Sequence, residues 1–139
     1  MNVSWIISQD ITDGLIDPAV INDTGTSWGS WSTWKGYKTN NCVCSDTNKA
    51  NYLVTRSFHK TVNLYIMEDS FMTIGKPEGV KLFNGQFKNS SISNKDDIIA
   101  LNIAVPDADI VLLAGFNFSP LLNTDEEALR ESRSEYYFN

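Results

Sequence analysis

The stretch Asp109-Ile-Val-Leu-Leu-Ala-Gly-Phe-Asn-Phe-Ser-Pro120 decides the expected fold of this 139-residue chain. Five consecutive apolar residues closed by a glycine are typical of a strand that is buried on both faces. Just before them, residues 96–105 have helical periodicity, and Pro106 ends the helix. A helix, a short turn and a two-sided buried strand indicate a parallel α/β sheet. We therefore expect residues 109–115 to form a central parallel strand.

The rest of the chain supplies further strands and helices in alternation. Strands are expected at 3–8, 62–67, 80–83 and 109–115, and helices at 45–60, within 70–77, at 95–105 and at 124–138, with Ser45 as the N-cap of the first. Helices that join parallel strands cross over right-handed and cover both faces of the sheet. The expected fold class is α/β, a small Rossmann-like three-layer sandwich with a mainly parallel sheet. Residues 1–139 are expected to form a single domain.

Residues 15–44 carry few regular signals, and we expect an irregular segment rich in Trp, Ser and Gly. Its aromatic residues recur at every third position, 28, 31, 34 and 37. Indole faces beside hydroxyls and Lys35 could hold a sugar, or a base with a phosphate nearby. The alternative is that the tryptophans fill the core over one sheet edge, because each buries roughly 150–250 Å². The sequence leaves both interpretations open.

Charge and hydropathy exclude several classes of partner. The chain has 11 Lys and Arg against 17 Asp and Glu, a formal charge of −6. Without a basic cluster, we expect neither nucleic-acid binding nor docking on an anionic membrane. No apolar run approaches the length that spans a bilayer, and residues 1–8 lack the basic and long apolar regions of a signal peptide. We expect a cytoplasmic protein.

The motifs of common catalytic and cofactor sites are absent. The chain has no Gly-rich dinucleotide loop, no P-loop and no G-x-S-x-G sequence. Its one histidine, His59, falls near a predicted helix end, where a surface role is expected. Cys42 and Cys44 form a C-x-C pair, which with one histidine makes no tetrahedral zinc site. We expect two free thiols, with one side of an extended segment buried and the other facing out, and no metal or cofactor.

Polar residues follow the predicted strands, so in a parallel sheet they should gather at the carboxyl edge. A pair such as Asp10 and Glu68 could perform acid–base catalysis or hold a divalent metal. Asp and Asn are also ordinary turn formers at strand ends, and the sequence does not decide whether the protein is an enzyme. The candidate ligand-binding residues are Ser8, Gln9, Asp10, Ser30, Trp31, Trp34, Lys35, Glu68, Asn84, Asn117 and Ser119.

The chain resembles short uncharacterised proteins of tailed bacteriophages in four stretches: Trp28-Gly-Ser-Trp31-Ser-Thr-Trp34, Thr39-Asn-Asn-Cys-Val-Cys-Ser-Asp46, Asp97-Ile-Ile-Ala-Leu and Asp109-Ile-Val-Leu-Leu-Ala-Gly-Phe. The resemblance covers most of the chain. It implies a phage-encoded cytoplasmic protein, and it transfers no activity and no catalytic residue.

Two functions are compatible with these features. The first is binding of a small molecule, a nucleotide, sugar or sugar phosphate, at the carboxyl edge of the sheet beneath residues 22–41. The alternative is a non-catalytic, oligomeric accessory protein of a phage. We expect a homo-oligomer, most simply a twofold dimer, because Tyr137 and Phe138 would otherwise leave an aromatic patch in water at the terminus.

Overall fold

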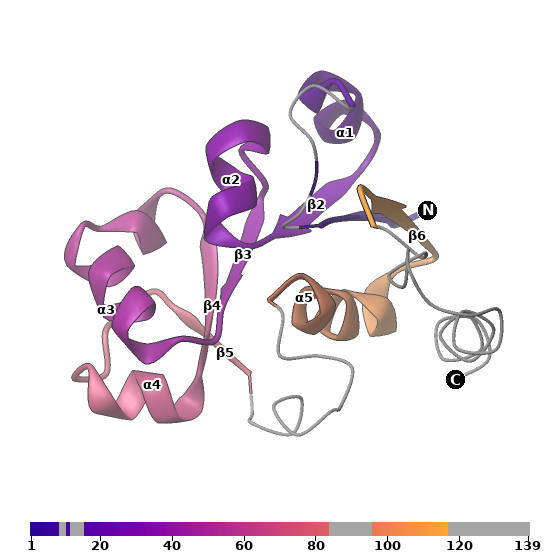
Figure 1. The fold of residues 1–139 in the computed structure, drawn as a ribbon. Helices are drawn as coiled ribbons and strands as arrows, with labels where there is room; N and C mark the ends of the chain where they lie inside the picture. Colours follow the sequence, from indigo (N-terminus) through magenta and orange to yellow (C-terminus); the bar gives the residue numbers. More distant parts are fainter. Residues whose placement is uncertain (9–10, 12–15, 84–95, 117–139) are drawn as a thin grey trace, which may run out of the picture.

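In the computed structural model, which describes residues 1–8, 11, 16–83 and 96–116, six strands form one parallel sheet. The strands are β1 (Val3–Ile7), β2 (Thr26–Gly29), β3 (Asn41–Cys44), β4 (Asn63–Met67), β5 (Lys81–Phe83) and β6 (Ile110–Ala114). Their order across the sheet is β5-β4-β3-β2-β1-β6, and every neighbouring pair is parallel (Figure 1). From β1 to β5 the chain therefore moves in one direction, and it then returns to place β6 beyond β1.

Helices cover both faces of this sheet. The α-helices are α1 (Pro18–Thr24), α2 (Trp31–Tyr37), α3 (Thr47–Thr55), α4 (Glu68–Thr73) and α5 (Asp96–Ala104), with short 3₁₀ turns η1 (Phe58–Lys60) and η3 (Val105–Asp107). Successive right-handed crossovers in one direction place α1 to α4 on one face. The long return to β6 puts α5 on the other face (Figure 1). This arrangement confirms the expected α/β class with its three layers.

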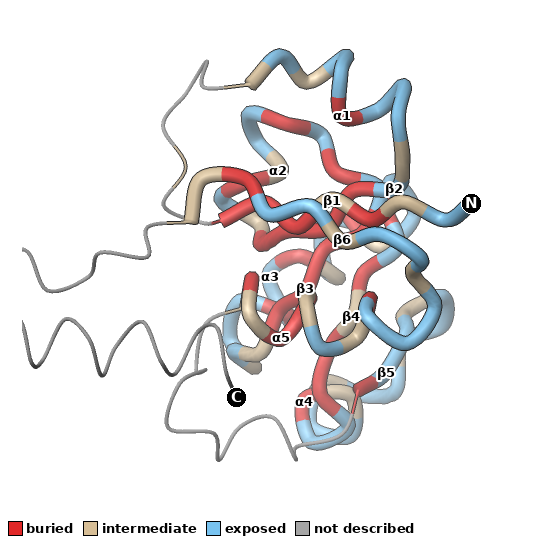
Figure 2. The backbone as a smooth tube through the Cα atoms, turned by 90° about the vertical axis from the view of Figure 1, so that its right-hand side faces the viewer, coloured by how far each residue is buried: buried red, intermediate tan, exposed pale blue. Residues whose placement is uncertain are grey.

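The two faces of the sheet have separate cores because strand side chains alternate between them. Cys42, Cys44, Leu64 and Ile66 pack against α3 and η1, with Trp31, Trp34 and Phe71 at the margin. Ile6, Trp28, Val43, Met67 and Phe83 pack on the opposite side against Ile99, Ala100 and Ala104 of α5. The inner strands are accordingly buried along most of their length (Figure 2).

The expectation of an irregular segment over 15–44 is wrong. These residues contain α1, β2, α2 and β3, a regular alternation of helix and strand. The two strands escape detection because they are short and carry buried polar residues in place of an apolar run. Ser27 is fully buried, and its N–H donates to Oδ1 of Asn40 at 2.9 Å. Its hydroxyl bonds the same oxygen at 3.1 Å and accepts from the Asn40 N–H at 2.9 Å. These hydrogen bonds satisfy the buried polar groups, so the strands lack the apolar pattern from which a strand is predicted.

The expected central position of residues 109–115 is also wrong. The structure confirms a parallel strand there, but β6 lies at the end of the strand order and pairs with β1, which is itself flanked by β2. Leu112 and Leu113 are 37% and 42% exposed, so the apolar run is not buried on both faces. An apolar run predicts a strand but does not distinguish an interior position from an edge.

The helix expected at 45–60 is shorter in the structure: α3 ends at Thr55, and η1 follows as a separate turn after the left-handed Ser57. The other sequence predictions agree with the structure where it describes them. The strands expected at 3–8, 62–67 and 80–83 are β1, β4 and β5, and the helix expected at 95–105 is α5. The helical turn expected within 70–77 begins earlier, at Glu68. The helix expected at 124–138, with Tyr137 and Phe138, lies outside the described residues. Among the residues that are described, no helix is long and apolar enough to span a membrane.

Candidate functional site

A pocket of about 270 Å³ opens at the carboxyl ends of β2 and β3. Helices α2 and α3 begin beside it on one face of the sheet, and α5 begins beside it on the other (Figure 1). The pocket is lined by Ser30, Trp31, Ser32, Cys44, Asp46, Lys49 and Asp96. It is thus the place where three helix starts from two layers meet over the strand ends, which is where α/β sheets bind ligands.

Hydroxyl groups form one wall of the pocket. Ser30 is the N-cap of α2, and its Oγ bonds Oγ of Ser32 at 2.9 Å and Oγ1 of Thr33 at 3.3 Å. The Thr33 hydroxyl in turn donates to the carbonyl of Ser8 at 3.4 Å. Ser8 lies at the end of β1, where its N–H donates to the carbonyl of Ala114 at 2.9 Å. A chain of hydrogen bonds therefore joins the pocket to the carboxyl ends of β1 and β6.

Two carboxylates lie on the opposite side of the pocket, and each is fixed through one oxygen. Oδ1 of Asp46 accepts from the N–H groups of Asn48 at 2.8 Å and Lys49 at 3.3 Å, which makes Asp46 the N-cap of α3. The predicted N-cap, Ser45, instead bonds Asp96: its N–H and hydroxyl donate to Oδ1 of Asp96 at 3.1 Å and 2.6 Å. Asp96 thereby ties the start of α5 to the end of β3.

The surroundings of Asp96 favour its protonated form. Burial raises the pKa of this carboxyl above its ordinary value, and the negative charges of Asp97 and Asp46 act in the same direction. The two hydrogen bonds from Ser45 oppose the shift because they stabilise the carboxylate. The net direction is upward. Asp96 therefore accepts a proton more readily than an exposed aspartate does.

The aromatic residues of α2 pack against the core more than they line the pocket. The rings of Trp31 and Trp34 stack with centroids 5.6 Å apart, and each meets Phe58 edge-on at 4.9 Å. The Lys35 ammonium lies 5.1 Å from the Trp31 centroid. Trp28 belongs to the other face of the sheet, 5.1 Å from Tyr65. The three tryptophans thus serve two cores, as the core-filling interpretation predicts, and only Trp31 also lines this pocket.

Both cysteines are buried, and their environment disfavours the reactive thiolate form. Cys42 and Cys44 are free thiols with 0% and 2% of their surface exposed. The expectation that one side of this segment faces out is wrong, because residues two apart on a strand point to the same face and both faces here are covered. Burial raises the pKa of each thiol from 9.0 to about 12. Cys44 therefore contributes an apolar wall to the pocket and no nucleophile.

The predicted site residues divide into three groups. Ser30 and Trp31 line the pocket, with Ser8 connected through Thr33 and Lys35 placed on the Trp31 ring. Trp34 lines a different pocket, at the amino edge, and Glu68 is an exposed residue of α4 outside the lining. The other five lie outside the described residues: Gln9, Asp10, Asn84, Asn117 and Ser119.

Sequence reasoning missed the acidic side of the pocket. Asp46 directly precedes α3, and Asp96 is the first residue of α5. Both helices start near the sheet edge, and Asp is common as a cap at helix starts. Their convergence depends on α5 approaching from the opposite layer, and the sequence does not specify that approach without the strand order. Within the described ranges, no three His, Cys, Asp or Glu side chains are grouped to hold a metal.

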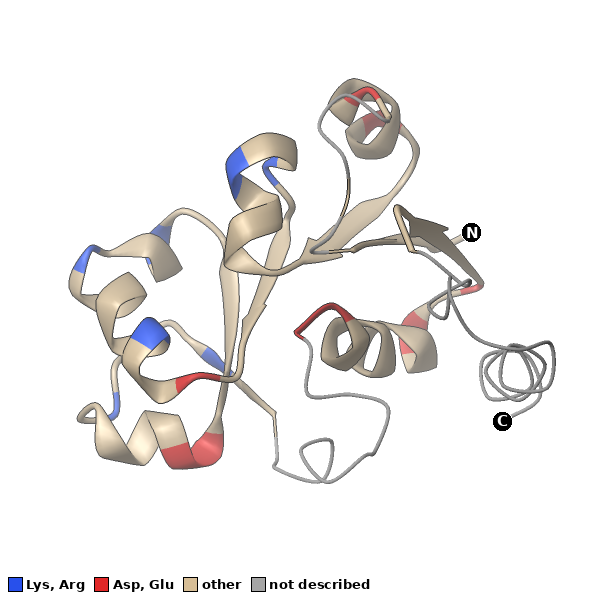
Figure 3. Ribbon diagram, in the orientation of Figure 1, with Lys and Arg blue, Asp and Glu red and all other residues tan. Residues whose placement is uncertain are grey.

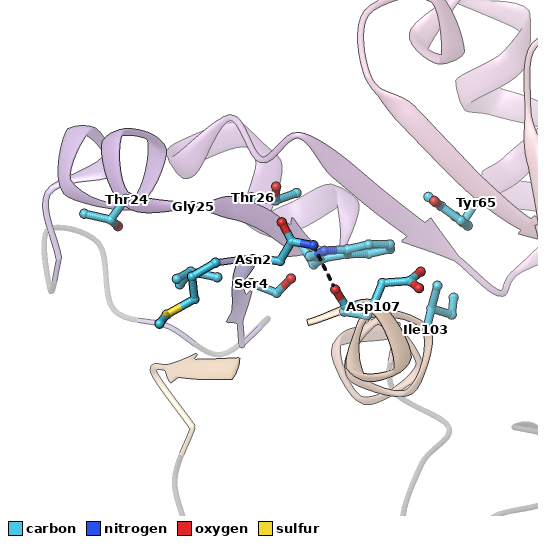
Figure 4. A pocket seen from close by; sticks show the side chains of 12 residues that line it. Asn2, Ser4, Thr24, Gly25, Thr26, Tyr65, Ile103 and Asp107 are labelled. Atoms are coloured by element: carbon cyan, nitrogen blue, oxygen red, sulfur yellow. Dashed lines mark hydrogen bonds between the residues drawn. The ribbon is translucent and has the colours of Figure 1, made fainter. Parts of the chain in front are cut away.

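A second pocket, of about 370 Å³, lies at the amino edge between β1, β2 and the end of α5 (Figure 4). Several of its polar groups are engaged by the chain itself. Asn2 donates through its side chain to the carbonyl of Asp107 at 3.3 Å and through its backbone to Asp109 at 2.7 Å. The Thr24 hydroxyl accepts from the Trp5 indole at 2.9 Å. These bonds join β1 to its neighbours.

Comparisons of this chain with protein-family models, with curated proteins and with solved structures found no match.

Proposed function

We propose that the protein binds a small neutral sugar, or a compound that presents one, in the pocket at the carboxyl ends of β2 and β3. The observation that carries the proposal is the convergence of two carboxylates, two serine hydroxyls and an indole on one cavity of about 270 Å³. Of the ligand classes that the sequence suggests, a nucleotide, a sugar or a sugar phosphate, the unphosphorylated sugar suits this set best.

The hydrogen-bonding groups match a ligand that carries several hydroxyls. Among the described residues, the hydrogen bonds that hold Asp46 and Asp96 end on Oδ1 of each carboxylate. A carboxylate has about four acceptor positions, so each retains capacity for ligand hydroxyl donors. The hydroxyls of Ser30 and Ser32 can accept or donate. Because these groups are fixed by the chain before a ligand arrives, binding requires little ordering of side chains.

Phosphate does not suit this pocket. Two acidic side chains line it against one lysine, Lys49 (Figure 3 shows the acidic starts of α3 and α5). The N-terminal N–H groups of α3, which could otherwise attract an anion, already bond the carboxylate of Asp46. A phosphorylated ligand would place like charges together in a partly buried space, which is unfavourable.

The proposal is tested by thermal shift and NMR titration with unphosphorylated monosaccharides, disaccharides and nucleosides. A ligand at about 100 times its dissociation constant should stabilise the fold by about 2.7 kcal/mol. Inorganic phosphate at the same ionic strength should not compete with that ligand. If no sugar or nucleoside shifts the melting temperature or any resonance from the pocket, the proposal is wrong.

A second candidate function, self-association, rests on the exposed edge of the sheet. In the described part of the chain, β6 pairs with β1 alone, and Ile110, Leu112 and Leu113 are each more than a third exposed. Apolar edge strands are common sites of strand pairing between copies. This role would suit an oligomeric accessory protein of a phage. Light scattering decides it: a dimer that Leu113→Lys converts to a monomer supports the role, and a monomeric wild-type chain excludes it.

A further inference from the structure

A third pocket differs in charge from the rest of this acidic protein. It has a volume of about 430 Å³ and lies at the amino edge of β3 and β4, between the turn that follows α2 and the turn that follows η1. The two turns are held together by the N–H of Asn63, which donates to the carbonyl of Asn40 at 3.1 Å. The lining consists of Trp34, Lys38, Thr39, Asn40, His59, Lys60, Thr61, Val62 and Asn63.

We propose that this pocket binds the phosphate group of a small phosphorylated molecule. Its described lining includes two lysines and the only histidine of the chain, and it includes no Asp or Glu. The whole chain carries a formal charge of −6, so an acid-free lining is a local departure from its composition. Lysine and arginine gather over α2, α3 and η1, whereas acidic residues lie mainly at α1, α4 and α5 (Figure 3).

The Lys38 ammonium is held in place by an aromatic ring. Its Nζ lies 3.9 Å from the centroid of the Trp34 ring, a cation–π contact. Lys38 caps α2 in the left-handed conformation, with φ 51°. Few residue types favour that conformation, and asparagine or glycine would be the usual choice there. A lysine in this place adds a positive charge to the pocket, and the described lining holds no carboxylate to neutralise it.

Neutral groups around the lysines add hydrogen-bond donors. Oδ1 of Asn40 accepts from the N–H of Ser27 at 2.9 Å and bonds the Ser27 hydroxyl at 3.1 Å, which fixes the amide and leaves its Nδ2 as the donor end. The exposed hydroxyl of Thr61 lies in the same lining. Nδ1 of His59 is buried without a hydrogen-bond partner among the described residues. Cationic and neutral donors around one cavity are the set that phosphate oxygens require.

This site is independent of the proposed sugar site. The two pockets lie at opposite ends of β3 and share no lining residue. A protein that fails to bind sugars could therefore still bind phosphate, and the reverse also holds. The separation matters for the test, because the failure of one proposal leaves the other standing.

The test is an NMR titration of the full chain with inorganic phosphate and with pyrophosphate, at constant ionic strength. Since His59 is the only histidine, its imidazole protons give a single, directly assigned reporter inside the pocket. We expect these resonances to shift and saturate at millimolar ligand. Lys38→Asn should weaken the affinity about tenfold, because it removes one charge-assisted contact from an otherwise intact backbone.

Lys76→Asn is the matched control. Lys76 is also exposed and left-handed, with φ 55°, but it lies outside this pocket, so the variant loses the same charge from the same backbone conformation. Its affinity should change less than about twofold. Lys38 also suits the C-terminal end of α2, so thermal melts of both variants separate a loss of binding from a loss of stability.

Three outcomes would overturn the proposal. The first is that phosphate and pyrophosphate leave the His59 resonances unchanged at millimolar concentration. The second is that Lys38→Asn and Lys76→Asn weaken binding equally, which would show a diffuse charge effect. The third is that a single-stranded oligonucleotide shifts the His59 resonances while both phosphates fail to do so, which would identify a nucleic-acid surface instead of a small-molecule site.

Discussion

Ser45 and Asp96 are 51 positions apart in the sequence, yet both the N–H and the hydroxyl of Ser45 donate to one carboxylate oxygen of Asp96, at 3.1 Å and 2.6 Å. This pair connects the end of β3 to the start of α5 across the edge of the sheet. It closes the acidic side of the pocket at the ends of β2 and β3, and it lies in a partly buried place where a negative charge is costly. The same contact therefore affects stability and, under the proposed function, ligand binding.

The first prediction concerns pH. The pKa of Asp96 is raised from 3.8, chiefly by burial, so the folded chain holds this proton more tightly than the unfolded chain does. The stabilisation from that proton is present below pH 3.8 and is lost as pH rises through the folded-state pKa. Asp96→Asn has no proton to lose, so its stability relative to wild type should rise across that window. Urea denaturation of both proteins from acidic to neutral pH measures the difference.

A second prediction concerns the edge position of β6. Leu112 is 37% exposed, whereas Leu64 in β4 is fully buried. Leu64→Ala should therefore cost about 2–5 kcal/mol, the usual range for a buried leucine. Leu112→Ala should cost clearly less than that, since more than a third of the Leu112 side chain is already exposed to solvent. Equal losses in chemical denaturation would place β6 in the interior of the sheet and contradict the strand order.

A third prediction concerns the start of β2. A Cβ added at Gly25 would lie 2.5 Å from the carbonyl oxygen of Val3, closer than real Cβ atoms approach backbone. Gly25→Ala should force β1 and β2 apart and cost more than about 2 kcal/mol. Gly36→Ala, at an exposed position inside α2, should be neutral or stabilising because alanine favours helix. Thermal denaturation of the two variants gives the comparison.

The buried thiols provide a fourth prediction. A pKa near 12 instead of 9.0 lowers the thiolate fraction of Cys42 and Cys44 about a thousandfold near neutral pH. Ellman's reagent should therefore react with the native protein only as fast as the fold opens to expose the thiols. In denaturant it should react rapidly with both thiols. A native thiol that reacts at the rate of a free cysteine would show that β3 is not enclosed as described.

The sequence predicts strands and helices wherever apolar residues set the pattern. Val3–Ile7, Asn63–Met67 and Asp96–Ala104 are predicted because apolar residues dominate each of them. Thr26–Gly29 and Asn41–Cys44 were missed because Ser27 and Asn41 occupy buried positions where an apolar residue is expected. The N–H of Ser27 donates to Oδ1 of Asn40, and Nδ2 of Asn41 donates to the carbonyl of Ser27 in β2. These bonds compensate for the burial, and no local sequence pattern encodes their partners.

The sequence predicts a site at the carboxyl edge of the sheet, and it names only part of the residues that line the pocket there. The end of the first predicted strand supplies Ser8, and the Trp/Ser/Gly-rich segment supplies Ser30 and Trp31. Asp46 and Asp96 come from helices in different layers, and their approach is set by the strand order. That order depends on long-range pairing, which a single sequence does not show.

The measurement that tests the central claim most directly is an NMR titration with an unphosphorylated sugar, comparing wild type, Asp96→Asn and Asp109→Asn. Asp109 also accepts a backbone N–H, but at the amino edge, so it is a matched control. We predict saturable shifts at Ser30, Trp31 and Ser32, about tenfold weaker binding for Asp96→Asn, and unchanged binding for Asp109→Asn. Shifts confined to the amino edge, or equal affinities for all three proteins, would contradict a sugar site at the ends of β2 and β3.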